Sequence, residues 1–146
     1  MSDTRQHRPT VSRGPLHPPR HGRPWERILV GGFFLLTAGV HVGIVFADPS
    51  TYDGFADSAL LDVVRTGWQD VFMARPRTGG LLLAAGEAVL GGLLLAGSRT
   101  ARAGWVGVLT FHAALLLFGF GFWPYAVSAG LALTALAVRD ARREPS

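Results

Sequence analysis

The feature that most constrains this chain is a run of twenty residues, 28–47, without a formally charged side chain. A helix needs about 20 apolar residues to cross the hydrocarbon layer of a membrane. In that layer every backbone N–H and C=O group must be satisfied within the protein, and a single helix meets this requirement by itself. The run therefore predicts a membrane-spanning helix and an all-α fold class.

Three further apolar runs predict three further membrane spans. Residues 78–97 carry one charged side chain, Glu87, and residues 103–122 carry none. Residues 123–138 form a shorter run of sixteen residues without a charge. By the same length criterion, the chain is expected to fold as a bundle of four transmembrane helices.

The segments outside these runs divide the chain into two tails and one long loop. Residues 1–27 hold five of the nine prolines and little to bury, which predicts a disordered tail before a membrane domain at 28–138. Residues 139–146 form the second tail. Residues 48–77 carry five aspartates, with apolar side chains at helical spacing. This pattern predicts a short interfacial helix on the membrane surface, with Trp68 as an anchor in the interface.

The arginines predict how the bundle is oriented. Eleven of the fourteen lie in the two tails and in the loop at 98–102, and three lie in the loop at 48–77. Because cytoplasmic segments carry an excess of basic residues, both termini are expected in the cytoplasm and the 48–77 loop outside it. Aromatic residues at the membrane boundaries indicate the same orientation: Trp25 and Trp105 on the inner side, Trp123 and Tyr125 on the outer side.

Composition excludes several classes of function. The chain has no cysteine, so it forms no disulfide, thiolate metal site or cysteine nucleophile. Its pI of about 11.0 reflects arginines at the ends of apolar runs, and no nucleic-acid-binding signature accompanies them. The sequence also lacks a phosphate-binding loop, a dinucleotide-binding glycine motif, HExxH and GxSxG. No catalytic residue is indicated, and a non-enzymatic role without a nucleic-acid partner is favoured.

Small residues recur every four positions on two of the predicted spans. In lipid, helices associate where small side chains let their backbones come close. We therefore expect these residues to form the ridges at which helices cross. They are Gly39, Gly43 and Ala47 on the first span, and Gly80, Ala84, Ala88 and Gly92 on the second.

Three ionisable side chains lie at membrane depth. At 1.5 Å per residue, His41 is about 9 Å from the outer boundary, Glu87 about 14 Å and His112 about 15 Å. A lone carboxylate at this depth costs several kcal/mol, so Glu87 must be protonated, hydrated or paired. Thr37 lies one helical turn before His41 and extends the polar face. We predict that Glu87 faces the inside of the bundle, near His41 or His112.

Four interpretations of this polar layer stay open. Histidine, which titrates near neutral pH, suits a proton relay or the recognition of a small polar or quinone-like molecule. Two histidines on facing helices can hold a haem, although their depths here differ by about 6 Å. Two imidazoles and one carboxylate can hold a metal ion. Interhelical hydrogen bonds, each worth about 1 kcal/mol, can also simply set the register of the bundle.

Two short motifs carry a resemblance to a known family. Gly39, Val40 and His41 approximate a GxxH pattern near the end of the first span, one residue shorter than that pattern, and GFW at 121–123 opens the fourth span. With the long outer loop, residues 28–138 resemble small four-helix bacterial membrane proteins of the DoxX-like kind. The resemblance implies a multi-pass protein of the bacterial cytoplasmic membrane, in some cases accessory to a redox or transport system. It carries over no catalytic residue.

The function expected from the sequence is that of a non-enzymatic component of the lipid bilayer. Such a bundle supports a partner membrane protein or a second copy of itself, or it binds a small lipophilic molecule at the polar layer. The alternative is a redox protein that holds haem or quinone as its cofactor, or a proton-handling protein of the transporter kind.

Overall fold

The computed structural model describes residues 25–143 of the chain. Their regular structure is entirely helical, which confirms the all-α fold class for this part of the chain. The predicted disordered tail lies outside the described residues for positions 1–24, as do the last three residues, 144–146.

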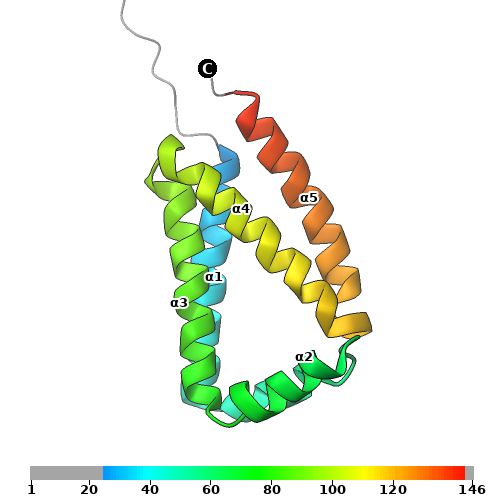
Figure 1. The fold of residues 1–146 in the computed structure, drawn as a ribbon. Helices are drawn as coiled ribbons and strands as arrows, with labels where there is room; N and C mark the ends of the chain where they lie inside the picture. The colour runs from blue at the N-terminus through cyan, green and yellow to red at the C-terminus, as the bar shows by residue number, and fades with distance from the viewer. Residues whose placement is uncertain (1–24, 144–146) are drawn as a thin grey trace, which may run out of the picture.

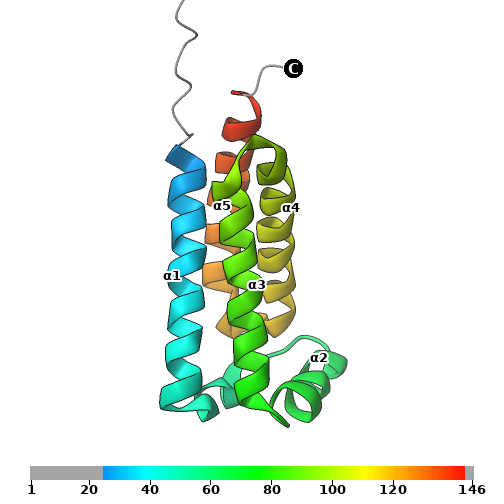
Figure 2. The same ribbon diagram turned by 90° about the vertical axis from the view of Figure 1, so that its left-hand side faces the viewer.

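Four long helices make up the bundle: α1 (Trp25–Ala47), α3 (Pro76–Ala96), α4 (Ser98–Leu115) and α5 (Trp123–Ala141). In Figure 1, α4 begins beside α3 and is tilted away from it toward α5, and Figure 2 shows the same helices turned by 90°. A 3-10 segment, η3 (Leu116–Gly121), continues α4. Three of these helical segments are long and apolar enough to cross a membrane, namely α1, α3 and α4 together with η3. Three of the predicted spans are therefore confirmed as helices capable of crossing a membrane.

Three short helical pieces connect α1 to α3, and with their linkers they form what we call the cap, residues 48–75. They are η1 (Pro49–Ala56), α2 (Asp62–Gly67) and a π-helical turn, η2 (Trp68–Phe72). The cap crosses one end of the bundle, and α1 begins and α5 ends at the opposite end (Figure 1). Asp48 caps η1, because its side chain accepts the Ser50 backbone N–H at 3.0 Å.

Two glycines let α1 and α3 approach each other closely. A Cβ atom added at Gly31 would lie 3.0 Å from the Gly91 carbonyl oxygen, and one added at Gly91 would lie 2.7 Å from the Gly31 oxygen. The buried residues of α3 follow steps of four and three: Gly80, Ala84, Glu87, Gly91 and Leu94. Such a repeat averages 3.5 residues and keeps one face toward a neighbouring helix.

The predicted packing ridges are wrong in part. Gly80 and Ala84 are buried, but open space surrounds Gly39, Gly43 and Gly92 at the position of a Cβ atom. Ala47 is exposed and Ala88 half-buried. Four residues turn about 40° beyond one full turn of a helix, so a stripe with a spacing of four winds off the contact face. The three steps that lead to Gly92 amount to about 120°.

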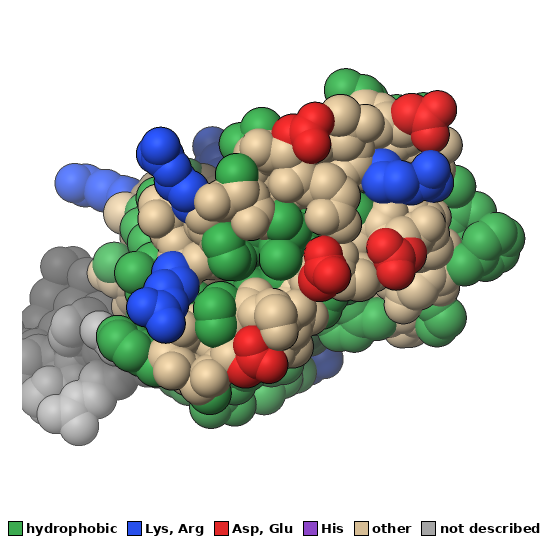
Figure 3. All heavy atoms as spheres, turned by 90° about the horizontal axis from the view of Figure 1, so that it is seen from below, with side chains coloured by type: hydrophobic (Ala, Val, Ile, Leu, Met, Phe, Trp, Pro, Cys, Tyr) green, Lys and Arg blue, Asp and Glu red, His purple; other side chains and the backbone are tan. Residues whose placement is uncertain are grey.

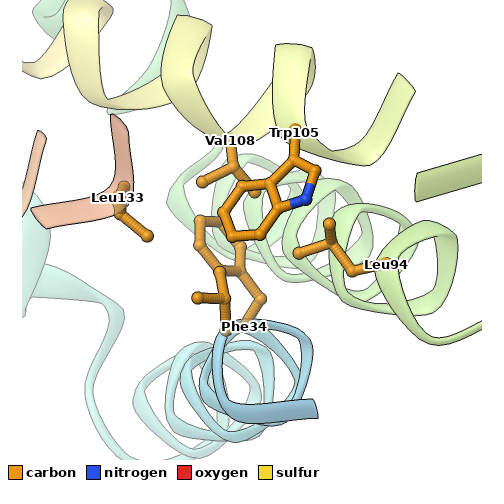
Figure 4. Close-up of a cluster of buried hydrophobic side chains, with 6 residues drawn as sticks. Phe34, Leu94, Trp105, Val108 and Leu133 are labelled. Carbon is orange, nitrogen blue, oxygen red and sulfur yellow. The ribbon is translucent and has the colours of Figure 1, made fainter. Parts of the chain in front are cut away.

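Side chains from all four long helices form the apolar core (Figure 4). The indole of Trp105 and the ring of Phe34 fill its centre, where they meet side chains of α3 and α5. The buried members of the core cluster are Val30, Phe34, Leu94, Trp105, Val108 and Leu133.

A buried ionic group closes the end of the bundle opposite the cap. The Arg27 Nε atom lies 2.9 and 2.8 Å from the two carboxylate oxygens of Asp140, and the Trp105 indole N–H donates to Asp140 at 2.8 Å. Beside them, Glu26 pairs with Arg139 at 3.2 Å and with Arg143 at 3.1 Å. We call this group of six residues the clasp. Its charges belong to α1, α5 and the residues that follow α5. The sequence predicts these positions in the two tails, residues 1–27 and 139–146.

The glycine crossing can be tested with neighbouring glycines of α3. We expect Gly91→Ala to lower the free energy of unfolding by about 1–3 kcal/mol, because the new methyl group would press on the Gly31 carbonyl. Gly92→Ala is the matched control, since it adds a methyl group in open space and raises helix propensity by up to about 1 kcal/mol. Denaturant unfolding in detergent micelles measures both variants. Equal free energies of unfolding for the two variants would show that α1 and α3 do not make their closest approach at Gly91.

Candidate functional site

A polar triad, Tyr52, His41 and Glu87, lies where the cap meets α1 and α3. The His41 Nδ1 atom lies 2.8 Å from the Tyr52 hydroxyl, and the two rings stack at a centroid distance of 5.7 Å. On its other side, His41 Nε2 lies 3.6 Å from Glu87 Oε1. This distance is an ion-pair contact and is longer than a hydrogen bond. The imidazole therefore stands between a phenol and a carboxyl group.

The helix crossing and the cap bring the triad together. Because α1 and α3 run antiparallel, residues of α1 that follow the crossing meet residues of α3 that precede it, and His41 meets Glu87 in this way. The η1 turn then returns the chain to α3, where Tyr52 packs against Gly80. A Cβ atom at Gly80 would lie 3.0 Å from the Tyr52 hydroxyl, so a glycine is needed there.

The buried carboxyl group of Glu87 is incompletely hydrogen-bonded among the described residues. Its side chain is only 6% exposed, and its Oε2 atom is buried without a hydrogen-bond partner in the part of the chain that the structure describes. The Thr37 hydroxyl lies within interaction range of the carboxyl group, while its own hydrogen bonds go to the carbonyls of Phe33 and Phe34 at 3.2 and 3.1 Å. Burying a polar atom without a partner costs free energy, so this oxygen is a candidate contact for something that the protein binds.

His112 forms a separate pair with Tyr125. Its Nδ1–H donates to the Val108 carbonyl at 3.0 Å, and its Nε2 atom lies 3.4 Å from the Tyr125 hydroxyl. Within residues 25–143, no hydrogen bond or ion pair joins His112 to Glu87. Of the four residues predicted for the polar layer, the structure brings together His41, Glu87 and Thr37 and leaves His112 apart.

Aromatic rings of the cap, of η3 and of Phe122 form a connected cluster that includes Tyr52 of the triad. Trp68 stacks on Phe72 with a centroid distance of 3.9 Å, and its indole N–H donates to the Tyr52 carbonyl at 2.9 Å. Trp68 was expected to be an anchor in the membrane interface, but it packs inside the cap. The connected rings are Tyr52, Phe55, Trp68, Phe72, Phe118 and Phe122.

The cap is tied to η3 through Ser58. The Ser58 hydroxyl donates to the Phe118 carbonyl at 2.8 Å and accepts the Gly121 N–H at 3.2 Å. Gly119 has a φ of +79°, and a Cβ atom there would overlap the Ser58 carbonyl oxygen. Only glycine adopts this positive φ readily and lacks the Cβ atom that would overlap Ser58. The contact therefore fixes the place at which α4 stops being α-helical.

The surroundings of Tyr52 keep its hydroxyl neutral. The whole residue is buried. Burial raises the pKa of Tyr52 above its usual value, and the negative charge of Glu87 raises it further. Loss of the proton from the Tyr52 hydroxyl is therefore disfavoured.

The histidines do not fit a haem or a metal centre. Both ring nitrogens of His112 already have partners, and those of His41 face Tyr52 and Glu87, so neither ring offers a nitrogen to a shared iron atom. Among the described residues, no three His, Cys, Asp or Glu side chains lie close enough together to hold a metal ion.

Sequence reasoning missed Tyr52 and Tyr125, the two partners of the histidines. Tyr125 was predicted only as an aromatic residue at the membrane boundary of the fourth span. Tyr52 belongs to the long loop at 48–77, outside the predicted spans. One signal was present, because these are the only tyrosines in the chain. Each lies within thirteen residues of the histidine that it contacts.

Comparison of the chain with protein-family models, curated proteins and solved structures gives no match. The resemblance to DoxX-like proteins stays a prediction from two short motifs.

A tyrosine titration tests the electrostatics of the triad. In Tyr125→Phe, Tyr52 is the only tyrosine, and its absorbance change should have a midpoint above the usual value of about 10. Adding Glu87→Gln should lower that midpoint, because it removes a negative charge. Adding Asp62→Asn, an exposed cap carboxylate, should leave the midpoint unchanged. An unshifted midpoint in the Glu87→Gln variant would show that Tyr52 does not sense this carboxylate.

Proposed function

We propose that the chain is a four-span integral membrane protein of the bacterial cytoplasmic membrane, with both termini in the cytoplasm and the cap outside. The proposed fourth span is α5, which runs beside α4 from the cap end to the clasp end (Figures 1 and 2). The charges of α5, Arg139 and Asp140, come in its last turn and are paired with Glu26 and Arg27. Paired charges at a helix end suit the boundary of a membrane.

The proposed position of the cap is in the outer interface, as an interfacial helix region between the first two spans. Seen from the cap end, acidic and basic side chains alternate with hydrophobic ones (Figure 3). Val63 of α2 and Val71 of η2 are 74% and 75% exposed. Exposed valines next to charged residues favour contact with the lipid headgroup region.

Because the chain has no cysteine, its topology can be tested with single cysteines. We expect a membrane-impermeant maleimide applied to intact cells to label Ser50→Cys in the cap. It should not label Ser98→Cys between α3 and α4 until the membrane is opened. Labelling of both positions from one side would contradict the proposed orientation, and membrane-permeant maleimide is the control for reactivity.

For its function, we propose that the bundle binds a small lipophilic molecule that carries a hydrogen-bond donor. One observation supports this proposal: the Oε2 atom of Glu87 is buried and has no hydrogen-bond partner within residues 25–143. The carboxyl oxygen can accept the hydroxyl or N–H group of a ligand, while the neighbouring helices supply an apolar surface for its hydrocarbon part. No step of this role requires catalysis.

A ligand of the quinone class also suits the residues present. A quinone accepts hydrogen bonds, and its reduced form donates them. The Tyr52 hydroxyl and the His41 ring lie beside Glu87 and can donate hydrogen bonds. The protein would then position the head group, and the ligand would supply the redox chemistry.

A specific observation favours an accessory role as the second candidate. Gly39 and Gly43 face away from the bundle and have open space around them. Small residues on an outward face of a helix let a helix of a partner, or of a second copy, come close in lipid. Such a partner would use a different face of α1 from the one that carries His41.

Native mass spectrometry of the protein extracted with its lipid tests the ligand. We expect a bound mass in addition to phospholipid. That mass should be lost in Glu87→Gln and kept in Asp62→Asn, which neutralises an exposed cap carboxylate. An unchanged bound mass in Glu87→Gln would show that the carboxyl group of Glu87 is not needed to bind the ligand. A second protein chain in place of a small molecule would favour the accessory role.

A further inference from the structure

We propose that Glu87 exchanges a proton with the cap side of the membrane only, and that His41 and Tyr52 carry this proton. The proposal goes beyond ligand binding, because a proton reaches a buried oxygen without an open cavity. It rests on the proposed topology in one respect, which is that the cap side is the outer side.

Toward the cap, groups that can pass a proton follow one another. Glu87 Oε1 lies 3.6 Å from His41 Nε2, and His41 Nδ1 lies 2.8 Å from the Tyr52 hydroxyl. The first gap must close by about 0.7 Å to become a hydrogen bond, which a small movement of either side chain achieves. Tyr52 itself is buried, but its chain neighbours Thr51 and Asp53 are exposed on the outer surface.

The triad has two complete hydrogen-bond arrangements that differ by one proton. In the first, the Tyr52 hydroxyl donates to His41 Nδ1, and the Nε2–H group points to an ionised Glu87. In the second, a protonated Glu87 donates to bare Nε2, His41 Nδ1–H donates to the Tyr52 oxygen, and the Tyr52 hydroxyl turns to the His41 carbonyl, 3.5 Å away. In both arrangements the Tyr52 hydroxyl, the His41 ring and the Glu87 carboxyl group each donate or accept a hydrogen bond within the triad.

The transfer between these arrangements balances. Tyr52 receives one proton from the cap side and passes its own proton to Nδ1, while the Nε2 proton moves to Glu87 Oε1. The net change is one proton added to the carboxylate and none left on the ring or the phenol. Since burial raises the pKa of Tyr52, this residue gives up its proton as it gains another and does not accumulate as tyrosinate.

No such path leads toward the clasp. From Glu87 to the end of α3 there is no polar side chain, and on α1 only Thr37 interrupts the apolar run back to Ile28. The core cluster fills the bundle between these helices and α4. On α5, the hydroxyls of Ser128 and Thr134 donate to carbonyls of their own helix.

Other titratable groups around Glu87 do not replace the path through Tyr52. On α5, Tyr125 lies close enough to be affected by the charge of Glu87, but no hydrogen bond joins the two among residues 25–143. Tyr125 contacts His112 of α4, whose other nitrogen donates to the Val108 carbonyl. A backbone carbonyl accepts a hydrogen bond but passes no proton onward, so this branch ends there.

The test uses the full chain in sealed phosphatidylcholine and phosphatidylglycerol vesicles. Infrared spectroscopy follows the protonated carboxyl band of Glu87, which is assigned by its loss in Glu87→Gln. Labelling of Ser50→Cys in parallel vesicles measures the fraction of molecules with the cap facing outward. After a pH jump outside the vesicles, the fraction of the band that responds should equal this cap-outward fraction. A response from the complementary fraction, or from all molecules at one rate, would overturn the proposal.

Two conservative variants identify the carrier. Tyr52→Phe should slow the response at least about tenfold, while the matched variant Tyr125→Phe should leave its rate within about twofold. Equal rates in the two variants would overturn the role of Tyr52. His41→Gln, which should also slow the response, keeps the test decisive if circular dichroism shows that Tyr52→Phe does not fold. If native mass spectrometry shows no bound mass on the unaltered protein while proton exchange is intact, the result counts against the proposed ligand and not against this inference.

Discussion

The close approach of α1 and α3 is the contact on which the rest of the structure depends. Apolar side chains gain little by leaving lipid for one another, so two helices need a place where their backbones can meet. Gly31 and Gly91 supply that place, each lying against the carbonyl oxygen of the other. The crossing sets the register of the two helices, and that register puts His41 beside Glu87. A shift by one residue would turn each side chain by about 100° and separate the pair.

Polar groups then hold the two ends of the bundle in different ways. At one end the clasp joins the first turn of α1 to the last turn of α5 with a buried ion pair between residues 113 positions apart. At the other end the cap packs aromatic rings around Tyr52 and is joined to η3 by hydrogen bonds of the Ser58 hydroxyl and of the Leu60 backbone N–H. Between these ends the described residues form an apolar core, with the His112 pair beside it and Glu87 of the triad near the middle of α3. The charges of the clasp thus lie at one end of the bundle, and the Glu87 carboxyl group lies between that end and the cap.

Much of the fold was predictable from hydropathy, because a span in lipid has few alternatives. The apolar runs at 28–47 and 78–97 match α1 and α3 to within a few residues. The packing ridges were harder, because a spacing of four residues was read as one face when the contact face repeats every 3.5. Glu87 and His41 were predicted to meet, since a carboxyl group at this depth needs a partner. Tyr52 was not predicted, because no periodicity shows that an irregular loop folds back onto a span.

The link between Ser58 and Phe118 also bears on the order in which the protein is assembled. These residues lie 60 positions apart, and Leu60 donates its N–H to the Leu117 carbonyl in the same contact. A chain is synthesised from its N-terminus, so α1, the cap segment and α3 exist before residues 117–121 do. Until then Ser58 and Leu60 lack these acceptors, and Phe55 lacks Phe122. Closure of the cap over the triad is therefore a late event in biogenesis, which follows completion of α4.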